Sequence, residues 1–412
     1  MQEQSKRLGV NMMDAQEINR ALALRVLQEK GECSRADIAK ATGLRQTTIT
    51  NIVGDLIQSG IVVETSLLRG ARGRRSIGLR LNQSLHRIIG IRLVRQQIRA
   101  GLFDITCTQH EYIEERISVQ EGVQAALGTM KSMIRRLIHL AGDAEILGIG
   151  LGVPGPYLRD SGQIAFMADF PGWEFVSIKD VLAQEFGLQV YIEYDSLAGA
   201  LAEWWFGGQR GDSKTLLAVR MEQGLGAGLV ENGLIYYGSQ GIAGNIGHLT
   251  IDYDGLPCAC GSKGCLRNYC TGKALLRDVA EALAARAQPS ALRGLPALTL
   301  RDVLDAARAG DSLAEEMVRR SARYLGYGLV SMVYVYNPDL IILSEEFAEA
   351  GDLYLDEIRL VLAERLQPAL RDNIRLAFTR LPYDPVIMGT VAVIVSWIMK
   401  TPSQHLRIGE RA

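Results

Sequence analysis

The sequence has few cysteines and almost no net charge. Six cysteines in 412 residues are too few for a disulfide framework, so we expect a reducing compartment. The 45 Lys/Arg nearly balance the 46 Asp/Glu, and the resulting net charge of −1 does not by itself indicate a nucleic-acid partner. The length and the ordinary hydrophobic content of 48% predict two or three domains with sizeable cores.

No hydrophobic run is long enough to cross a membrane. The most apolar stretch, Val386 to Met399, has fourteen residues and includes Gly389 and Thr390, whereas a spanning helix needs about twenty. We therefore expect it to form a buried helix. The N-terminus is polar and lacks the apolar segment of a signal peptide. Together these absences predict a cytoplasmic protein with no membrane partner.

The charges that are present are unevenly distributed. Residues 1–85 contain thirteen Lys/Arg and eight Asp/Glu, a balance of +5, which leaves −6 for the remainder. A basic end on an acidic body is typical of a DNA-binding head attached to a sensor domain.

The basic end has the pattern of three helices. Ser34 and Asp37 form a capping-box start for a short second helix, and Gly43 is a natural stop after it. A third helix is expected over residues 46–59, with apolar positions on one side. Its outward positions are Gln46, Thr47, Thr50 and Asn51. Short polar side chains there can reach base edges in a major groove, and Arg45 just before them can reach a phosphate.

Two predicted strands, over residues 61–64 and 76–81, flank an arginine-rich loop without acidic residues. Its cations are Arg69, Arg72, Arg74 and Arg75. A glycine-loosened basic loop between two strands suits a wing that contacts phosphates or enters a minor groove. On charge alone, a solvated loop beside a protein-interaction module is equally acceptable. The order of three helices and a wing favours binding to double-stranded DNA.

One imidazole and three thiols occur within eighteen residues: His248, Cys258, Cys260 and Cys265. Neutral imidazole and thiolate are the ligands that tetrahedral Zn²⁺ prefers, and four protein ligands leave no open position. We therefore predict a structural zinc site. The alternative is four unrelated residues in a glycine-rich loop. Cys270, just beyond, is interpreted as an ordinary buried thiol.

Beyond residue 87, strand-like and helix-like segments alternate, which predicts α/β layers. The expected strands are residues 88–91, 98–104, 146–153, 190–193, 216–219 and 340–343.

Two motifs resemble the signature of the ROK family (repressors, open reading frames, kinases): residues 241–248 (Gly-Ile-Ala-Gly-Asn-Ile-Gly-His) and 258–266 (Cys-Ala-Cys-Gly-Ser-Lys-Gly-Cys-Leu). The head resembles those of the family's repressors of the N-acetylglucosamine and xylose type, although Arg45 replaces their usual serine cap. The resemblance implies an α/β fold with an N-terminal winged helix-turn-helix and a two-lobed, actin-like, ROK sugar-kinase-like body. The expected domains are residues 1–85, residues 86–194 completed by 385–412, and residues 195–384 with the zinc loop.

Kinases of this family hold ATP with three stretches, and this sequence departs from each. Residues 91–96 (Ile-Arg-Leu-Val-Arg-Gln) replace Asp-x-Gly-Gly-Thr, residues 222–228 begin with Glu-Gln, and residues 344–346 (Ser-Glu-Glu) replace a triple glycine. Phosphoryl transfer depends on phosphate positioning and charge neutralisation. The resemblance therefore implies a kinase-like body that is not an enzyme.

The family's sugar pocket lies beside the zinc histidine, so the resemblance implies an effector site here that is formed by Tyr194, Asp195, Asn245, His248 and Arg267. Tyr194 and Asp195 stand where kinases have Asn-Asp, while Asn245 and Arg267 replace two glutamates. Asp195 keeps the position of the catalytic base, or else is simply a helix N-cap. Arg267 favours an anionic ligand such as a sugar phosphate or sugar acid, unless it pairs internally with Asp195.

These features predict a sugar-responsive transcription regulator, a repressor of carbohydrate-related genes, acting as a homodimer or homotetramer on a pseudo-palindromic site. Control by a protein partner instead of a sugar is the alternative from another class. A sugar kinase with an extra domain would require the phosphate-binding set that is missing here.

Overall fold

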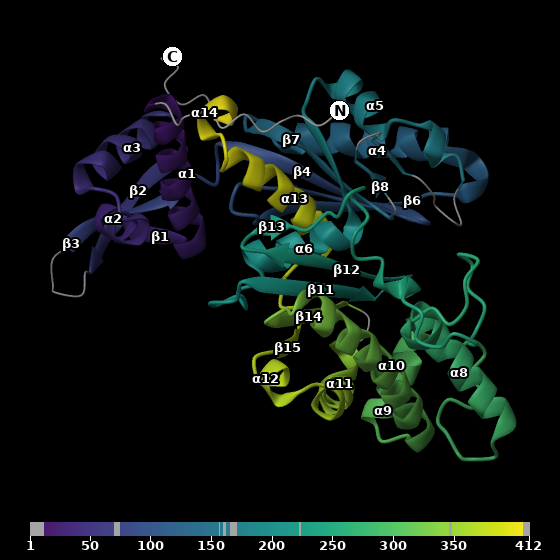
Figure 1. The fold of residues 1–412 in the computed structure, drawn as a ribbon. Coiled ribbons are helices and arrows are strands. Elements are labelled where there is room, and N and C mark those ends of the chain that lie inside the picture. Colours follow the sequence, from purple (N-terminus) through teal and green to yellow (C-terminus); the bar gives the residue numbers. More distant parts are fainter. Residues whose placement is uncertain are drawn as a thin grey trace. The chain divides into compact units, whose positions relative to one another are not determined.

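The computed structural model describes residues 12–69, 75–155, 157–159, 162–164, 171–221, 224–345 and 348–406 (Figure 1). The chain forms two compact units. Unit 1 comprises Met1–Gly152, Ala168–Ile192 and Thr390–Ala412, and unit 2 comprises Val153–Met167 and Glu193–Gly389. The head and most of the first large sheet both belong to unit 1, so the domain boundary expected at residue 85 stays a prediction.

The head contains three helices and a three-stranded sheet of order β1-β3-β2. Its elements are α1 (Met12–Lys30), β1 (Glu32–Ser34), α2 (Arg35–Thr42), α3 (Gln46–Gln58), β2 (Val62–Arg69) and β3 (Arg75–Leu81). The predicted capping box starts α2: the Asp37 amide donates to Ser34 Oγ at 3.2 Å, and the Ser34 amide donates to Asp37 Oδ2 at 3.0 Å. Gly43, at φ 72°, ends α2 in the left-handed conformation.

The first five-stranded sheet has the order β10-β7-β4-β5-β6. Its strands are β4 (His86–Val94), β5 (Gln97–Phe103), β6 (Gln109–Arg116), β7 (Glu145–Val153) and β10 (Val190–Tyr194). Helices α4 (Gly122–Leu140) and α5 (Ile178–Phe186) accompany it. Residues 88–94 of β4 are buried without interruption, as expected for a strand in the middle of a covered sheet.

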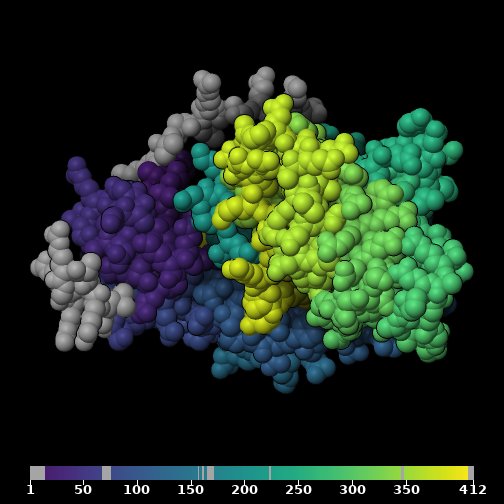
Figure 2. All heavy atoms as spheres, turned by 90° about the horizontal axis from the view of Figure 1, so that it is seen from below, coloured from purple at the N-terminus to yellow at the C-terminus, as the bar shows by residue number. Residues whose placement is uncertain are grey.

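The second five-stranded sheet, of order β13-β12-β11-β14-β15, lies in unit 2. Its strands are β11 (Thr215–Met221), β12 (Leu225–Glu231), β13 (Leu234–Ile235), β14 (Leu340–Glu345) and β15 (Arg375–Phe378). The helices of this unit are α6 (Asp195–Phe206), α7 (Arg267–Cys270), α8 (Gly272–Ala285), α9 (Leu300–Arg308), α10 (Ser312–Tyr336), α11 (Asp352–Arg365) and α12 (Pro368–Arg371). Much of the surface that unit 2 presents in Figure 2 consists of these helices, in green to yellow-green.

Every segment expected to be a strand overlaps one of these strands, although the segments expected over 61–64 and 98–104 each extend one residue beyond β2 and β5. The apolar run after residue 385 forms α13 (Pro385–Ile398), followed by the short α14 (Pro402–His405). The side chains of Val386, Val391 and Val395 in α13 are fully buried, which confirms the expected buried helix. Among the described residues, no helix is both long and apolar enough to span a bilayer.

Helix α6 packs closely on strand β12 because glycines face it. A Cβ on Gly228 would overlap the side chain of Ala200 and lie 2.5 Å from the Ser196 carbonyl oxygen, and a Cβ on Gly226 would overlap the Ser196 hydroxyl. These are two of the glycines retained from the family's phosphate motif. In this structure, helix–sheet packing accounts for them, without any ligand.

We predict that Gly228→Ala will lower the free energy of unfolding by about 1–3 kcal/mol, because the added methyl group forces α6 away from β12. Urea denaturation followed by tryptophan fluorescence measures the change. Gly54→Ala is the matched control: a Cβ at this exposed position in α3 meets nothing within 4 Å, so stability should rise by about 0.5–1 kcal/mol. Wild-type stability in Gly228→Ala would contradict the packing argument.

Candidate functional site

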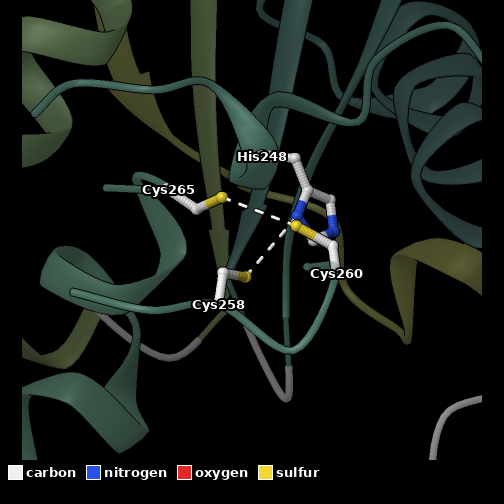
Figure 3. Close-up of side chains that lie close together, drawn as sticks. All are labelled: His248, Cys258, Cys260 and Cys265. Carbon is white, nitrogen blue, oxygen red and sulfur yellow. Dashed lines mark hydrogen bonds between the residues drawn. The ribbon is translucent and has the colours of Figure 1, made fainter. Parts of the chain in front are cut away.

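The four predicted metal ligands lie together. Figure 3 shows His248, Cys258, Cys260 and Cys265 pointing toward one another. Their donor atoms all lie within 4.8 Å of one another. The sulfurs of Cys260 and Cys265 are 3.7 Å apart, and His248 Nδ1 is 3.8 Å from Cys258 Sγ. Ligands at about 2.3 Å from a tetrahedral ion lie about 3.8 Å from one another, so the spacing fits one closed four-ligand site.

The loop that carries these ligands is held by its own backbone. Thr250 and Cys265 form an isolated antiparallel bridge, and the amide of Ile251 donates to the Gly264 carbonyl at 2.9 Å. Gly264 has φ +64°, and a Cβ there would overlap the carbonyl oxygen of Asp252. Only glycine fits this position, which explains its occurrence immediately before the last cysteine.

The protonation of these ligands follows from their surroundings. Burial and the nearby Arg267 lower the pKa of His248, which keeps the imidazole neutral, as a metal requires. A hydrogen bond from the Ser262 backbone lowers the pKa of Cys260. Burial and the neighbouring thiols raise the pKa of Cys265 to about 12. Binding of a cation to Cys265 at neutral pH would therefore release a proton.

Tyr194 is at the centre of the predicted effector residues. It is 6% exposed, and its hydroxyl donates to Asn245 Oδ1 at 3.2 Å. The ring occupies space that glycines leave open, because a Cβ on Gly155 would overlap the ring and one on Gly226 would lie 2.9 Å from the hydroxyl. Burial raises the pKa of Tyr194 above its usual value. Tyr194 therefore stays a neutral hydrogen-bond donor.

Two other predicted effector residues, Asp195 and Arg267, act electrostatically on Tyr194. Asp195 is the first residue of α6, and the Ser196 hydroxyl donates to its Oδ1 at 3.1 Å. The N-cap of α6 is Tyr194, so the interpretation of Asp195 as the cap is wrong. Arg267 begins α7 and acts electrostatically on both Tyr194 and His248. Within the described part of the chain, no ion pair joins Arg267 to Asp195.

Three residues of this region were missed from the sequence. Glu193 is almost fully buried, and its Oε2 accepts hydrogen bonds of 2.9 Å from both Arg159 and the Tyr237 hydroxyl. The Arg159 guanidinium lies 3.8 Å from the centre of the Tyr237 ring. Burial raises the pKa of Glu193. The one available signal was a glutamate inside the apolar strand β10; its partners are too distant in sequence to be inferred.

Two residues of the stretches that correspond to the kinases' ATP-holding motifs in the resemblance are buried in strands. Arg92 is buried within β4. In unit 2 the hydroxyl of Ser344 is buried in β14 and donates to the Val219 carbonyl at 3.2 Å. Glu222 and Glu346 lie outside the described residues.

Helix α3 has the two faces that the sequence predicted. Ile49, Ile52, Val53 and Leu56 are buried. The residues on its outer side and at its cap are exposed: Arg45, Gln46, Thr47, Thr50 and Asn51. Arg45 occupies the N-cap without a side-chain hydrogen bond to the helix, so its cation is available to a phosphate. Arg72 and Arg74 lie outside the described residues; Arg75 begins β3, but its side chain is not described.

Two sequence families match the chain. The ROK family matches residues 88–393, and a winged helix-turn-helix DNA-binding family matches residues 22–63. The putative xylose repressor of Caldicellulosiruptor sp. (strain Rt8B.4) is 31% identical over 393 residues, covering 94% of this chain and 97% of that protein. The N-acetylglucosamine repressor of Escherichia coli O6:H1 is 28% identical over 398 residues, covering 95% of each protein.

Solved structures have the same architecture. A ROK family transcriptional regulator, described as a homologue of the E. coli MLC protein, has a TM-score of 0.82 at 24% identity, covering 96% of this chain and 100% of that chain. The ROK hexokinase from Thermus thermophilus has a TM-score of 0.61 at 28% identity, covering 76% of this chain and 98% of that chain. The predicted fold, a winged helix-turn-helix followed by a kinase-like α/β body, is confirmed.

Proposed function

We propose that this chain, which belongs to the ROK family, is a DNA-binding transcriptional repressor of carbohydrate-related genes whose body responds to a sugar-type effector. The observation that carries the proposal is the exposed polar face of α3, adjoining a winged hairpin, in a chain similar along 94% of its length to a putative xylose repressor. Chromosomal DNA as the partner is consistent with action in the cytoplasm.

In the proposed mode of binding, α3 enters the major groove. Gln46, Thr47 and Asn51 contact base edges, while Arg45 contacts a phosphate. The wing arginines supply further backbone contacts, which make binding sensitive to salt. Such heads act as two-fold pairs on half-sites one helical turn apart, or multiples of it. The working form is accordingly a homodimer or a larger even-numbered assembly.

We place the effector site around Tyr194. Its hydroxyl, together with Asp195 and Asn245, offers hydrogen bonds to the hydroxyl groups of a sugar. Arg267 adds a cation, which favours a sugar phosphate or sugar acid over a neutral sugar. A ligand bound there contacts the start of α6 and the segment before the metal loop. Coupling of about 1–3 kcal/mol between effector and DNA is typical of allosteric proteins.

The body is proposed to bind this ligand without phosphorylating it. Phosphoryl transfer requires backbone and cations that cradle a polyphosphate. The glycines of β12 are instead occupied by the approach of α6, and Ser344 is hydrogen-bonded within the sheet. These features support a sensor, although the fold is shared with a hexokinase.

His248, Cys258, Cys260 and Cys265 would hold a structural zinc ion. The donor set and its spacing fit Zn²⁺, which would fix the local geometry of the loop and supply no open coordination position. In this proposal the loop that carries the four residues holds Asn245, just before it, and Arg267, just after it, at a fixed separation.

Selection of bound genomic DNA fragments with the purified protein, followed by footprinting, tests the repressor. We expect a discrete pseudo-palindromic site. Thr47→Ala should weaken binding to that site by about 1–3 kcal/mol and make the protein less selective for its sequence. The double change Arg74→Ala with Arg75→Ala should weaken binding to all DNA sequences about equally. Salt-sensitive binding without a preferred sequence would rule out operator recognition.

Titration calorimetry with a panel of sugars, sugar phosphates and sugar acids tests the effector site. We predict that an anionic member binds and that Arg267→Glu lowers its affinity at least about tenfold, because attraction becomes repulsion. Lys273→Glu in α8, an exposed cation, controls for net charge and should change the affinity little. Unchanged binding of the anionic ligand to Arg267→Glu would exclude this role for Arg267.

Metal analysis of the purified protein tests the zinc site. We expect one zinc per chain, and its loss in Cys260→Ser together with a lower Tm, because the loop then lacks its cross-link. Cys270→Ser should keep the metal, since this buried thiol bonds to the Leu266 carbonyl and serine can do the same. Zinc retained at full stoichiometry in Cys260→Ser would contradict the four-ligand assignment.

A further inference from the structure

The C-terminal segment of the chain is hydrogen-bonded to the first helix of the head. Within unit 1, the amide of Ser403 donates to Glu17 Oε1 at 2.7 Å, and the Ser403 hydroxyl donates to Glu17 Oε2 at 2.6 Å. Arg20 in turn donates to the Ser403 hydroxyl at 2.9 Å. These groups are separated by more than 380 residues of sequence, so the contact is wholly tertiary.

Arg20 also contacts the predicted recognition helix. Its second terminal nitrogen donates to Asp55 Oδ2, near the end of α3, at 2.9 Å. The Arg20 side chain is 17% exposed. A guanidinium presents its donors in a planar fork, which lets one side chain hold two partners in a fixed geometry. Arg20 therefore connects α1, α3 and α14.

The segment that Arg20 holds continues directly from α13, the helix in which the chain passes from unit 2 to unit 1. In unit 2, a Cβ on Gly389 would overlap the Ala198 carbonyl oxygen of α6. In unit 1, a Cβ on Gly150 of β7 would lie 2.7 Å from the Thr390 carbonyl oxygen. No side chain separates the backbones at either point, so the unit 2 part of α13 packs closely on α6, and the unit 1 part packs closely on β7.

We propose that Arg20, Glu17 and Ser403 form a latch in which Arg20 acts as a positioning residue: it fixes the recognition helix to the C-terminal segment and thereby sets the placement of the paired heads. This rests on the proposed function. Two heads can occupy both half-sites of an operator at once only when their separation matches the DNA. The latched form is the one that binds the full operator.

Two further observations support a role in positioning. The base-contacting residues are at the start of α3, whereas Asp55 lies three residues before its end, so the latch leaves the DNA-binding face free. Partly buried ion pairs also add little to the free energy of unfolding, because the cost of desolvating the charges offsets their attraction. In this proposal the charged groups of the latch instead hold α1, α3 and α14 in a defined geometry.

The first arm of the test uses the full-length protein without DNA. In wild type, the Ser403 amide is protected from hydrogen exchange by Glu17. We expect Glu17→Ala to speed exchange in residues 402–406 about tenfold, as for the loss of one hydrogen bond to a charged group. Glu29→Ala, near the other end of α1 and exposed, is the control. Equal exchange in wild type and Glu17→Ala would show that the latch does not form in solution.

The second arm compares binding to two duplexes taken from the genomic selection: the full operator and a single half-site. Ser403→Ala should lower the affinity for the full operator about tenfold and change the affinity for the half-site by less than about twofold. The reason is that it removes the hydroxyl contacts to Glu17 and Arg20 but leaves the Arg20–Asp55 pair. Gln404→Ala, an exposed neighbour in α14, should change neither.

Equal weakening of both duplexes by Ser403→Ala would mean a merely destabilised head, and no weakening of either would mean an inert contact; both results overturn the proposal. The two arms also distinguish failure of the latch from failure of the repressor function. If Glu17 protects the Ser403 amide but the wild-type protein selects no operator, the repressor function is refuted and the latch contact is still established.

Discussion

The close approach of helix α6 to strand β12 and to helix α13 is the contact on which the rest of the candidate site depends. It requires glycines 226, 228 and 389, because a Cβ at any of them would collide with α6. The approach brings the start of α6, with Tyr194 and Asp195, to the segment that carries Asn245. A side chain inserted here would displace the start of α6 and with it the proposed effector residues Tyr194 and Asp195.

The same contact explains how a kinase fold can serve regulation. Glycines that resemble the family's phosphate motif are occupied by the packing of α6, and the Ser344 hydroxyl donates to the Val219 carbonyl within the sheet. In the proposed function, the polar side chains around Tyr194 recognise hydroxyl groups of the ligand, and Arg267 recognises an anion. When such a body is attached to a winged helix-turn-helix, the free energy of ligand binding can shift the equilibrium between two arrangements of the heads.

Sequence reasoning succeeded where the determinants are local. The capping box of Ser34, the Gly43 stop and the faces of α3 depend on neighbours a few residues apart, and the side chains that could hold a metal ion come from one short loop. It failed where partners are distant. The Glu193–Arg159 pair spans 34 residues and the Glu17–Ser403 contact 386, and no local pattern encodes either. The alternative interpretation of Asp195 as a helix N-cap was wrong, because Tyr194 is the N-cap and Asp195 is the first helical residue of α6.

The central claim, that this ROK protein represses transcription through a head fixed by its body, is tested most directly by a crystal structure of the full chain bound to its selected operator. The account predicts a two-fold complex in which the start of α3, from Gln46 to Asn51, occupies the major groove of each half-site, with Ser403 still hydrogen-bonded to Glu17. A complex with α3 turned away from the DNA would contradict operator recognition. A complex with α3 in the groove but Ser403 detached from Glu17 would contradict the fixed head.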